Sequence, residues 1–352
     1  MTLQETLSRI RPLDEAAMEE CRRRWGQVAH PLGSLGLLEE ALIQIAGITG
    51  SADIRLEKKA VALFCADNGV VAQGVTQTDS SITALVARSF AAGTSSVCRM
   101  AKVAGAEIFP VDVGVAEDLD CPGVWDRKVA YGTGDITQGP AMSRSQAIQA
   151  VEAGIETVEL LARRGCQVIA TGEMGIGNTT TSSAVIAAIL NLAPEEVTGR
   201  GAGLSTEGLC RKIGAVRRAL ERNRPDPADG LDVLAKVGGF DLAALAGAFL
   251  GGAALHLPVL VDGIISAAGA LAASVICPEV KGYLVASHAS GEPAGESVCR
   301  ALGLKPLIRC GMRLGEGTGA VAALPLLEMA LAVYQEVGTF ADHEMDAYEP
   351  LE

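Results

Sequence analysis

The segment GEMGIGNTTTSS (172–183) has a composition suited to binding an anion. It joins one apolar run, CQVIAT, to another, AVIAAILNLA, and therefore should connect a strand to a helix. Its GxxxxGNT spacing is close to that of a phosphate loop, except that Asn178 stands where that loop has lysine. Backbone N–H groups at a helix start bind phosphate without lysine, which predicts a monophosphate ligand. A tight turn capped by Thr179–Thr181 is the alternative.

A second glycine-rich segment, TGRGAGLSTEGLCRK (198–212), also opens a predicted helix. Ser205 is placed to cap that helix, and Arg211 and Lys212 follow about two turns later. The segment could wrap a phosphate or a ribose, and a plain glycine-rich turn is the alternative. Its GRGAG spacing does not match the GxGxxG pattern of dinucleotide-binding folds.

The segment MRLGEGTGA (312–320) places Glu316 between two glycines, just before a long apolar helix. A carboxylate buried beside apolar neighbours such as Leu314 has a raised pKa and can act as a general base. We expect no histidine close to it. The alternative is a glutamate that stabilises the helix N-terminus through the helix dipole.

A fourth segment, ADNGVVAQGVTQTDSSIT (66–83), surrounds a glycine-rich turn with polar side chains: Asp67, Asn68, Asp79, Ser80 and Ser81. Such a cluster can bind sugar hydroxyls or a metal, although a structural turn explains it as well. Met174 and Leu314 could supply apolar walls for a flat ring, and both are equally suited to the core.

Five apolar runs should be the strands that position these loops: 59–69, 106–114, 166–175, 257–263 and 281–292. Continuous apolar strands that alternate with helices predict an α/β fold, with a parallel sheet covered on both faces. Ligands bind at the carboxyl ends of such strands. Polar residues occur there in this chain: Asp67, Asn68, Glu173, Asp262, Ser287 and His288.

The two ends of the chain read as helical. The first fifty residues carry amphipathic patterns, with Ser34 as an expected N-cap, and a last helix is expected over 319–338. We therefore expect a small helical domain from residues 1–50 and 320–352, and a large α/β domain from residues 51–319.

Composition excludes several functions. The net charge of −13 argues against nucleic acid or an anionic membrane as a partner. Nine scattered cysteines without a CxxC pair fit a reducing compartment, and four isolated histidines provide no zinc site. The charged N-terminus has no signal-peptide core, so we expect a cytoplasmic protein. His256, Pro258 and Asp262 interrupt the apolar stretch 242–276, which predicts buried helices around a strand and no membrane span.

Taken together, these segments resemble the nicotinate-nucleotide–dimethylbenzimidazole phosphoribosyltransferase family of cobamide biosynthesis. The resemblance extends from about Pro31 to Phe340 and rests on motifs that occur in order. They are PxGSLGxLEE, DNGVVxxGV, GPAMSR, GEMGIGNTT, TGRGxGL, GGFDLAALAG, VDGxISAA, ASHxSxEP and MRLGEGTGA.

The resemblance implies an enzyme that moves 5-phosphoribose from nicotinate mononucleotide to a lower-ligand base such as 5,6-dimethylbenzimidazole. It implies a Rossmann-like sheet with a small helical domain, a homodimer whose partner helps close the site, and no metal or cofactor. Glu316 would be the catalytic base and Glu173 a second carboxylate. The phosphate and ribose would be held by Gly175, Gly177, Asn178, Thr179, Gly201, Gly203, Lys212 and Ser290. The acceptor pocket would lie near Ser80, Met174 and Leu314.

The sequence departs from the family pattern at three places: His30-Pro31-Leu32, Gly134-Asp135 and the loop QTDSSIT. These departures leave the acceptor open, and the heterodimeric relatives that attach phenol or p-cresol through oxygen are the alternative. A nucleotide-binding homologue without catalysis is a second alternative, which Glu316 disfavours. A nucleotide-dependent oxidoreductase is a third, which the lack of GxGxxG disfavours.

Overall fold

The computed structural model describes residues 1–348, whose centre is a six-stranded parallel sheet in the order β3-β2-β1-β4-β5-β6. The strands are β1 (Lys59–Ala66), β2 (Ala106–Gly114), β3 (Trp125–Asp126), β4 (Val168–Met174), β5 (Val259–Val261) and β6 (Leu284–Ala286). This is the strand order of a Rossmann fold, in which successive strands are added towards one edge of the sheet from β1 and towards the other edge from β4. The crevice at the carboxyl ends of β1 and β4 is therefore the expected ligand position.

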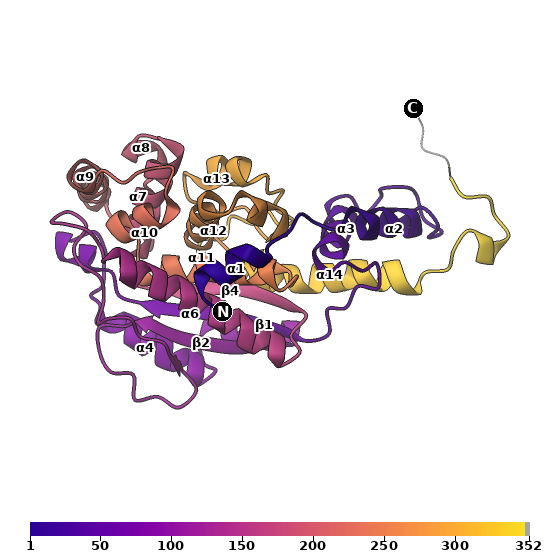
Figure 1. The fold of residues 1–352 in the computed structure, drawn as a ribbon, viewed down its shortest axis with the longest axis horizontal. Helices are drawn as coiled ribbons and strands as arrows, with labels where there is room; N and C mark the ends of the chain where they lie inside the picture. Colours follow the sequence, from indigo (N-terminus) through magenta and orange to yellow (C-terminus); the bar gives the residue numbers. More distant parts are fainter. Residues whose placement is uncertain (349–352) are drawn as a thin grey trace.

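Helices cover both faces of the sheet. In chain order they are α1 (Leu3–Arg9), α2 (Glu15–Trp25), α3 (Leu37–Thr49), α4 (Ser81–Ala91), α5 (Ser96–Ala104), α6 (Arg144–Arg163), α7 (Asn178–Leu190), α8 (Pro194–Val197), α9 (Thr206–Asn223), α10 (Gly230–Val237), α11 (Phe240–Ala254), α12 (Ile264–Ile276), α13 (Gly295–Leu302) and α14 (Thr318–Glu336), with 3-10 turns η1 (Gly69–Gln73), η2 (Pro278–Tyr283) and η3 (Ala341–His343). α6 and α11 pack on β1 and β2, whereas α4 and α5 also contact β2 and α14 contacts β4. Figure 1 shows α7 to α10 gathered at one end of the molecule and α2 and α3 at the other.

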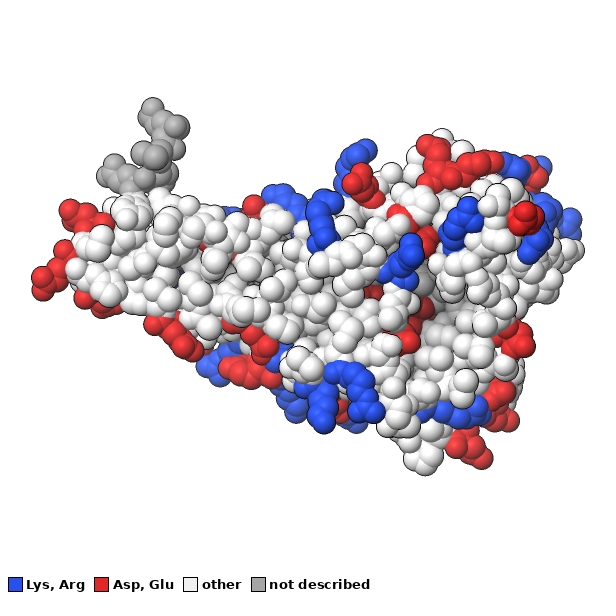
Figure 2. Space-filling view, turned by 180° about the vertical axis from the view of Figure 1, so that it is seen from behind, with Lys and Arg blue, Asp and Glu red and all other residues white. Residues whose placement is uncertain are grey.

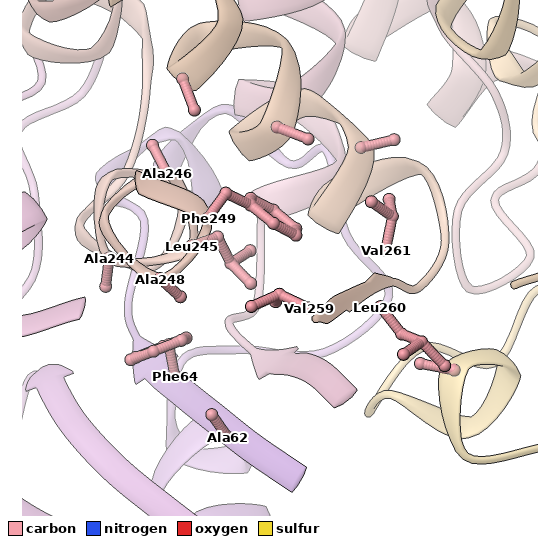
Figure 3. Close-up of a cluster of buried hydrophobic side chains, with 14 of the residues drawn as sticks. Ala62, Phe64, Ala244, Leu245, Ala246, Ala248, Phe249, Val259, Leu260 and Val261 are labelled. Atoms are coloured by element: carbon pink, nitrogen blue, oxygen red, sulfur yellow. The ribbon is translucent and has the colours of Figure 1, made fainter. Parts of the chain in front are cut away.

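The core lies between the sheet and α11, every residue of which is buried. Figure 3 shows Phe64 of β1 below Ala244 and Ala248 of α11, with Phe249 above Val259 of β5. Small side chains let α11 and α6 approach closely, because a Cβ at Gly154 or Gly247 would overlap backbone of the other helix. This abundance of alanine and glycine explains why the chain needs few aromatic residues.

α2, α3 and the far end of α14 form a separate helical cluster, with Trp25 of α2 5.0 Å from the Tyr334 ring of α14. α1 lies elsewhere, packed on α6 and α11, and the backbone N–H of Leu3 donates to Glu152 of α6. The division into residues 1–50 with 320–352 and residues 51–319 stays a prediction. Within residues 1–348, α14 alone is long and apolar enough to cross a membrane, and 56% of that stretch is buried in the protein.

The parallel sheet and the helix–strand–helix reading of 242–276 are confirmed. The prediction that Ser34 caps a helix is wrong: α3 begins at Leu37 after Gly36, and the Ser34 hydroxyl lies 2.8 Å from the His30 Nδ1. Gly36 takes a positive φ of 56°, which starts the helix without a side-chain cap. The short strand β3 was not expected from the sequence, because two residues carry no alternating pattern.

Candidate active site

A cavity of about 250 Å³ opens at the carboxyl ends of the strands. Figure 2 shows this wide end of the molecule hollowed between two lobes, with acidic and basic side chains close together along the hollow. Its walls come from six loops and from Lys212 of α9. The loop residues are 75–78, 173–179, 200–202 with 204, 262–265, 288 with 290 and 292, and 313–316. The structure thus brings together the four segments that the sequence singled out.

The segment 175–179 turns from β4 into α7, and Gly177 takes a positive φ of 96° at the N-cap of the helix. Two of its backbone N–H groups already have protein partners, since Ile176 donates to Thr83 Oγ1 and Asn178 to Gly175 O, and the next one, of Thr180, donates to Gly177 O. The N–H groups of Gly177 and Thr179 are therefore the ones suited to an anion at the helix start.

Lys212 reaches this anion position from α9. Its side chain is 1% exposed, and Nζ donates to Thr179 Oγ1 at 2.7 Å. Burial lowers the Lys212 pKa from 10.5 to about 8, against the attraction of Glu292. Gly201 lies directly over this contact, because a Cβ there would be 3.1 Å from Thr179 Oγ1 and 3.3 Å from Lys212 Nζ. A buried ammonium group beside a helix N-terminus is suited to a phosphate.

Glu316 has a positive φ of 59°, an uncommon conformation for a residue with a side chain. Its neighbours Gly315 and Gly317 also have positive φ values, of 88° and 84°, so the three residues form a sharp turn before α14. The Glu316 carboxylate accepts a hydrogen bond from the backbone N–H of Val97, in the first turn of α5, at 3.2 Å. The side chain is half-buried, so it is held in place and still reaches the cavity.

Asp262, at the end of β5, fixes the other side of this turn. Its two carboxylate oxygens accept from Gly317 N at 3.2 Å and Ala320 N at 2.9 Å, and so cap the start of α14. Burial raises the Asp262 pKa, while the neighbouring His288 opposes that shift. His288 is itself buried and lines the cavity, with Nδ1 3.9 Å from Asp262. The sequence-based expectation of a site without histidine is therefore wrong.

Glu173 lies in β4 at the floor of the cavity, 6% exposed. Its carboxyl accepts from Asn178 Nδ2 and from the backbone N–H of Glu316. Burial, followed by repulsion from Asp241, raises the Glu173 pKa to about 8. Asp241, at the start of α11, accepts from the same Asn178 nitrogen at 3.0 Å, and burial raises its pKa to about 6.

Most residues expected in the site line the cavity: Glu173, Met174, Gly175, Gly177, Asn178, Thr179, Gly201, Lys212, Ser290, Leu314 and Glu316. Ser80 and Gly203 are not among the described residues that line the cavity. Thr76, Gln77 and Thr78 form the wall on the side of Ser80. Gly203 is adjacent, since its carbonyl accepts from the Gln77 side chain.

Asn178 was expected to hold the phosphate or the ribose, but its side chain is bonded inside the protein. The side chain is 4% exposed, and its amide nitrogen donates to both Glu173 and Asp241. An amide NH₂ has two protons, so its donor capacity is used inside the protein. Sequence reasoning assigned no role to Asp241, Arg200 or Glu292, although Asp241 lies in the quoted GGFDLAALAG motif. No spacing rule links an α11 residue to a loop sixty residues earlier.

Comparison with known proteins identifies close relatives along the whole chain. The sequence profile of a phosphoribosyltransferase family matches residues 10–345. The nicotinate-nucleotide–dimethylbenzimidazole phosphoribosyltransferase of Ruminiclostridium cellulolyticum is 47% identical over 352 residues, covering 100% of both chains. The enzyme of the same name from Roseiflexus sp. is 48% identical over 341 residues, covering 97% of each chain. The crystal structure of CobT from Thermus thermophilus is similar, with a TM-score of 0.90, 40% identity and coverage of 95% of this chain and 100% of that chain.

Proposed function

Because the chain belongs to the nicotinate-nucleotide–dimethylbenzimidazole phosphoribosyltransferase family, we propose that it transfers 5-phosphoribose from nicotinate mononucleotide to 5,6-dimethylbenzimidazole. The products are nicotinate and an α-riboside 5′-phosphate, an intermediate of cobamide biosynthesis. The observation that carries this function is the identity of 47% over the full length of a relative with that name. The cavity at the switch point of the sheet supports it with a cation, an anion-binding helix start and a carboxylate.

The 5′-phosphate is bound at the start of α7. The Lys212 ammonium, the Thr179 hydroxyl and the N–H groups of Gly177 and Thr179 lie there, and Ser290 lines the same cavity. Charged hydrogen bonds of this kind are worth about 1.5–3 kcal/mol each. They hold the ribose so that C1 is directed towards the Glu316 side of the cavity.

Glu316 is the general base. In the transfer, the bond from C1 to the nicotinate nitrogen breaks and a bond from C1 to a benzimidazole nitrogen forms. Nicotinate leaves from a pyridinium, whose nitrogen takes the electron pair, so no acid is needed to expel it. The acceptor must lose the proton of its other nitrogen, which Glu316 takes. Carboxylates that face the cavity also stabilise positive charge at C1 in the transition state.

The acceptor ring lies between Met174 and the exposed Leu314, beside the wall of Thr76 to Thr78. The names of the relatives favour a benzimidazole over a phenol. With Ser80 outside the lining, Thr78 is better placed than Ser80 to contact the acceptor ring, and the Thr76 hydroxyl donates to the Thr78 carbonyl and so fixes this wall.

We place the enzyme in the cytoplasm as a homodimer. All nine cysteines are free thiols, as a reducing compartment requires. Val103 of α5 and Met329 of α14 are 87% and 58% exposed on neighbouring helices, which gives a second copy an apolar surface to cover. Sedimentation analysis of the wild type and of V103E/M329E tests the dimer, which the double variant should dissociate.

The activity is tested by incubating the purified chain with nicotinate mononucleotide and 5,6-dimethylbenzimidazole. Nicotinate and the α-riboside phosphate should appear in equal amounts, measured by liquid chromatography with mass detection. The matched control is Glu316→Gln, which keeps the shape of the side chain and removes its basicity. A wild type that releases no nicotinate with any azole or phenol acceptor refutes the proposal.

A further inference from the structure

The reaction described above makes no use of Asp241, although it is the most deeply buried acid near the cavity. It is 0% exposed at the start of α11, a helix otherwise composed of apolar and glycine residues. Its Oδ1 accepts from the N–H of Leu242 and its Oδ2 from the Asn178 side chain, both at 3.0 Å. An acid buried in this position has a large desolvation cost, which requires a structural or functional reason.

Asn178 connects Asp241 to the cavity floor. Its amide nitrogen lies between the Asp241 and Glu173 carboxyl groups and donates to both. Gly315 also packs against Glu173, since a Cβ added there would lie only 2.8 Å from Glu173 Oε1. Glu173 therefore cannot move away from Asp241, because Asn178 and the Glu316 turn hold it on two sides.

The groups packed around Glu173 disfavour a negative charge there. Asp241 faces it from α11 and Asp262 from the end of β5, and both are acids. Asn178 of α7 and the backbone N–H of the Glu316 turn act in the other direction, because their hydrogen bonds to the carboxyl lower its pKa, but burial and the two acids outweigh them. The pKa of Cys65 in β1 is raised well above its usual value by burial and by nearby acids, which include Glu173 and Asp241. The Glu173 pKa of about 8 and the Asp241 pKa of about 6 make Asp241 the charged member at neutral pH.

We propose that Asp241 is a positioning residue that acts through Asn178 and holds Glu173 as a neutral acid, whose O–H is a hydrogen-bond donor at the cavity floor. The donor serves an oxygen of the substrate, either a ribose hydroxyl or a carboxylate. The inference deepens the proposed function, on which it rests. It also explains how a cavity lined by several acids accepts a substrate that carries a phosphate and a carboxylate.

The test is infrared spectroscopy of the protein without substrate, followed through the C=O band of a protonated carboxyl group. The Glu173 band is assigned as the one that Glu173→Gln removes. At pH 7 it should be present in the wild type and should disappear as the pH rises through about 8. In Asp241→Asn, which keeps an acceptor for Asn178 and removes the charge, the band should disappear about one to two pH units lower.

Three comparisons make the result specific. Asp241→Ser removes the same charge with a smaller side chain, so the conclusion does not depend on the folding of one variant. Asp112→Asn, at a buried acid paired with Lys128 at 2.9 Å, is the matched control and should leave the Glu173 band unchanged. In turnover, Glu173→Gln keeps a donor, and its kcat/KM should exceed that of Glu173→Ala about tenfold or more.

Two outcomes overturn the proposal. A wild type whose spectrum at pH 7 contains no band sensitive to Glu173→Gln has an ionised Glu173. A band that titrates at the wild-type pH in both Asp241 variants means that Asp241 is only structural. Neither measurement needs turnover, so failure of the proposed transferase reaction is recognised separately, by the absence of nicotinate release from the wild type.

Discussion

Lys212→Met should make the free enzyme more stable and less able to bind nicotinate mononucleotide. The Lys212 side chain is 1% exposed, and the fall of its pKa from 10.5 to about 8 corresponds to about 3 kcal/mol of cost for the buried charge. Losing the hydrogen bond to Thr179 removes about 1 kcal/mol of that gain. The net stabilisation expected at pH 7 is therefore about 2 kcal/mol.

The sign of the pH dependence follows from the same shift. The folded state binds the Lys212 proton less tightly than the unfolded state, so the destabilisation is complete below pH 8 and disappears as the pH rises towards 10.5. Denaturant unfolding of wild type and Lys212→Met at pH 7 and pH 10 measures this difference. The stability advantage of the variant should shrink at the higher pH.

Ligand binding should change in the opposite direction. A charged hydrogen bond to phosphate is worth about 1.5–3 kcal/mol, so affinity for nicotinate mononucleotide should fall about 10- to 150-fold. Nicotinate riboside, which lacks the phosphate, should bind the variant and the wild type about equally. Calorimetric titration of both ligands decides the matter. Equal losses for the two ligands, or a variant less stable at pH 7, would refute the role of Lys212 as a buried phosphate-binding cation.

Other perturbations test the remaining parts of the site. Glu316→Gln should lower kcat about 10²–10⁴-fold with nearly unchanged nucleotide affinity, and a wild-type rate across pH would contradict its role as base. Gly177→Ala should weaken nicotinate mononucleotide binding more than riboside binding, because the residue has a positive φ and its Cβ would lie 3.0 Å from Val71. Competition between 5,6-dimethylbenzimidazole and p-cresol should favour the benzimidazole in kcat/KM, and a tenfold preference for the phenol would support the oxygen-linked alternative. Thr78→Ala should reduce that benzimidazole preference more than Ser80→Ala, since Thr78 lines the cavity and Ser80 does not.

The sheet was predictable because each buried strand is a continuous apolar run followed by a polar or glycine turn. The β2 bounds of 106–114 agree with the expected run, and Ser205 caps α9 as expected. The contents of the site were harder to predict, since the position of Asp241 beside Asn178 depends on tertiary packing of α11. Ser34 failed as a cap for a different reason: its hydroxyl makes a local contact with His30, four residues earlier, and the helix begins after Gly36 instead.

The start of α14 gives distant residues influence over catalysis. The helix begins two residues after Glu316, where Asp262 anchors it, and ends among α2 and α3, where Tyr334 packs on Trp25. Its nineteen residues, with Pro325 among them, span about 28 Å, so a tilt of about 5° moves the far end by about 2 Å. Substitutions around Trp25 can therefore change the orientation of the Glu316 carboxylate although they replace no residue that lines the cavity. For directed evolution, the positions that change turnover therefore include residues of the helical cluster at the far end of α14. Trp25 fluorescence reports the tilt of that helix.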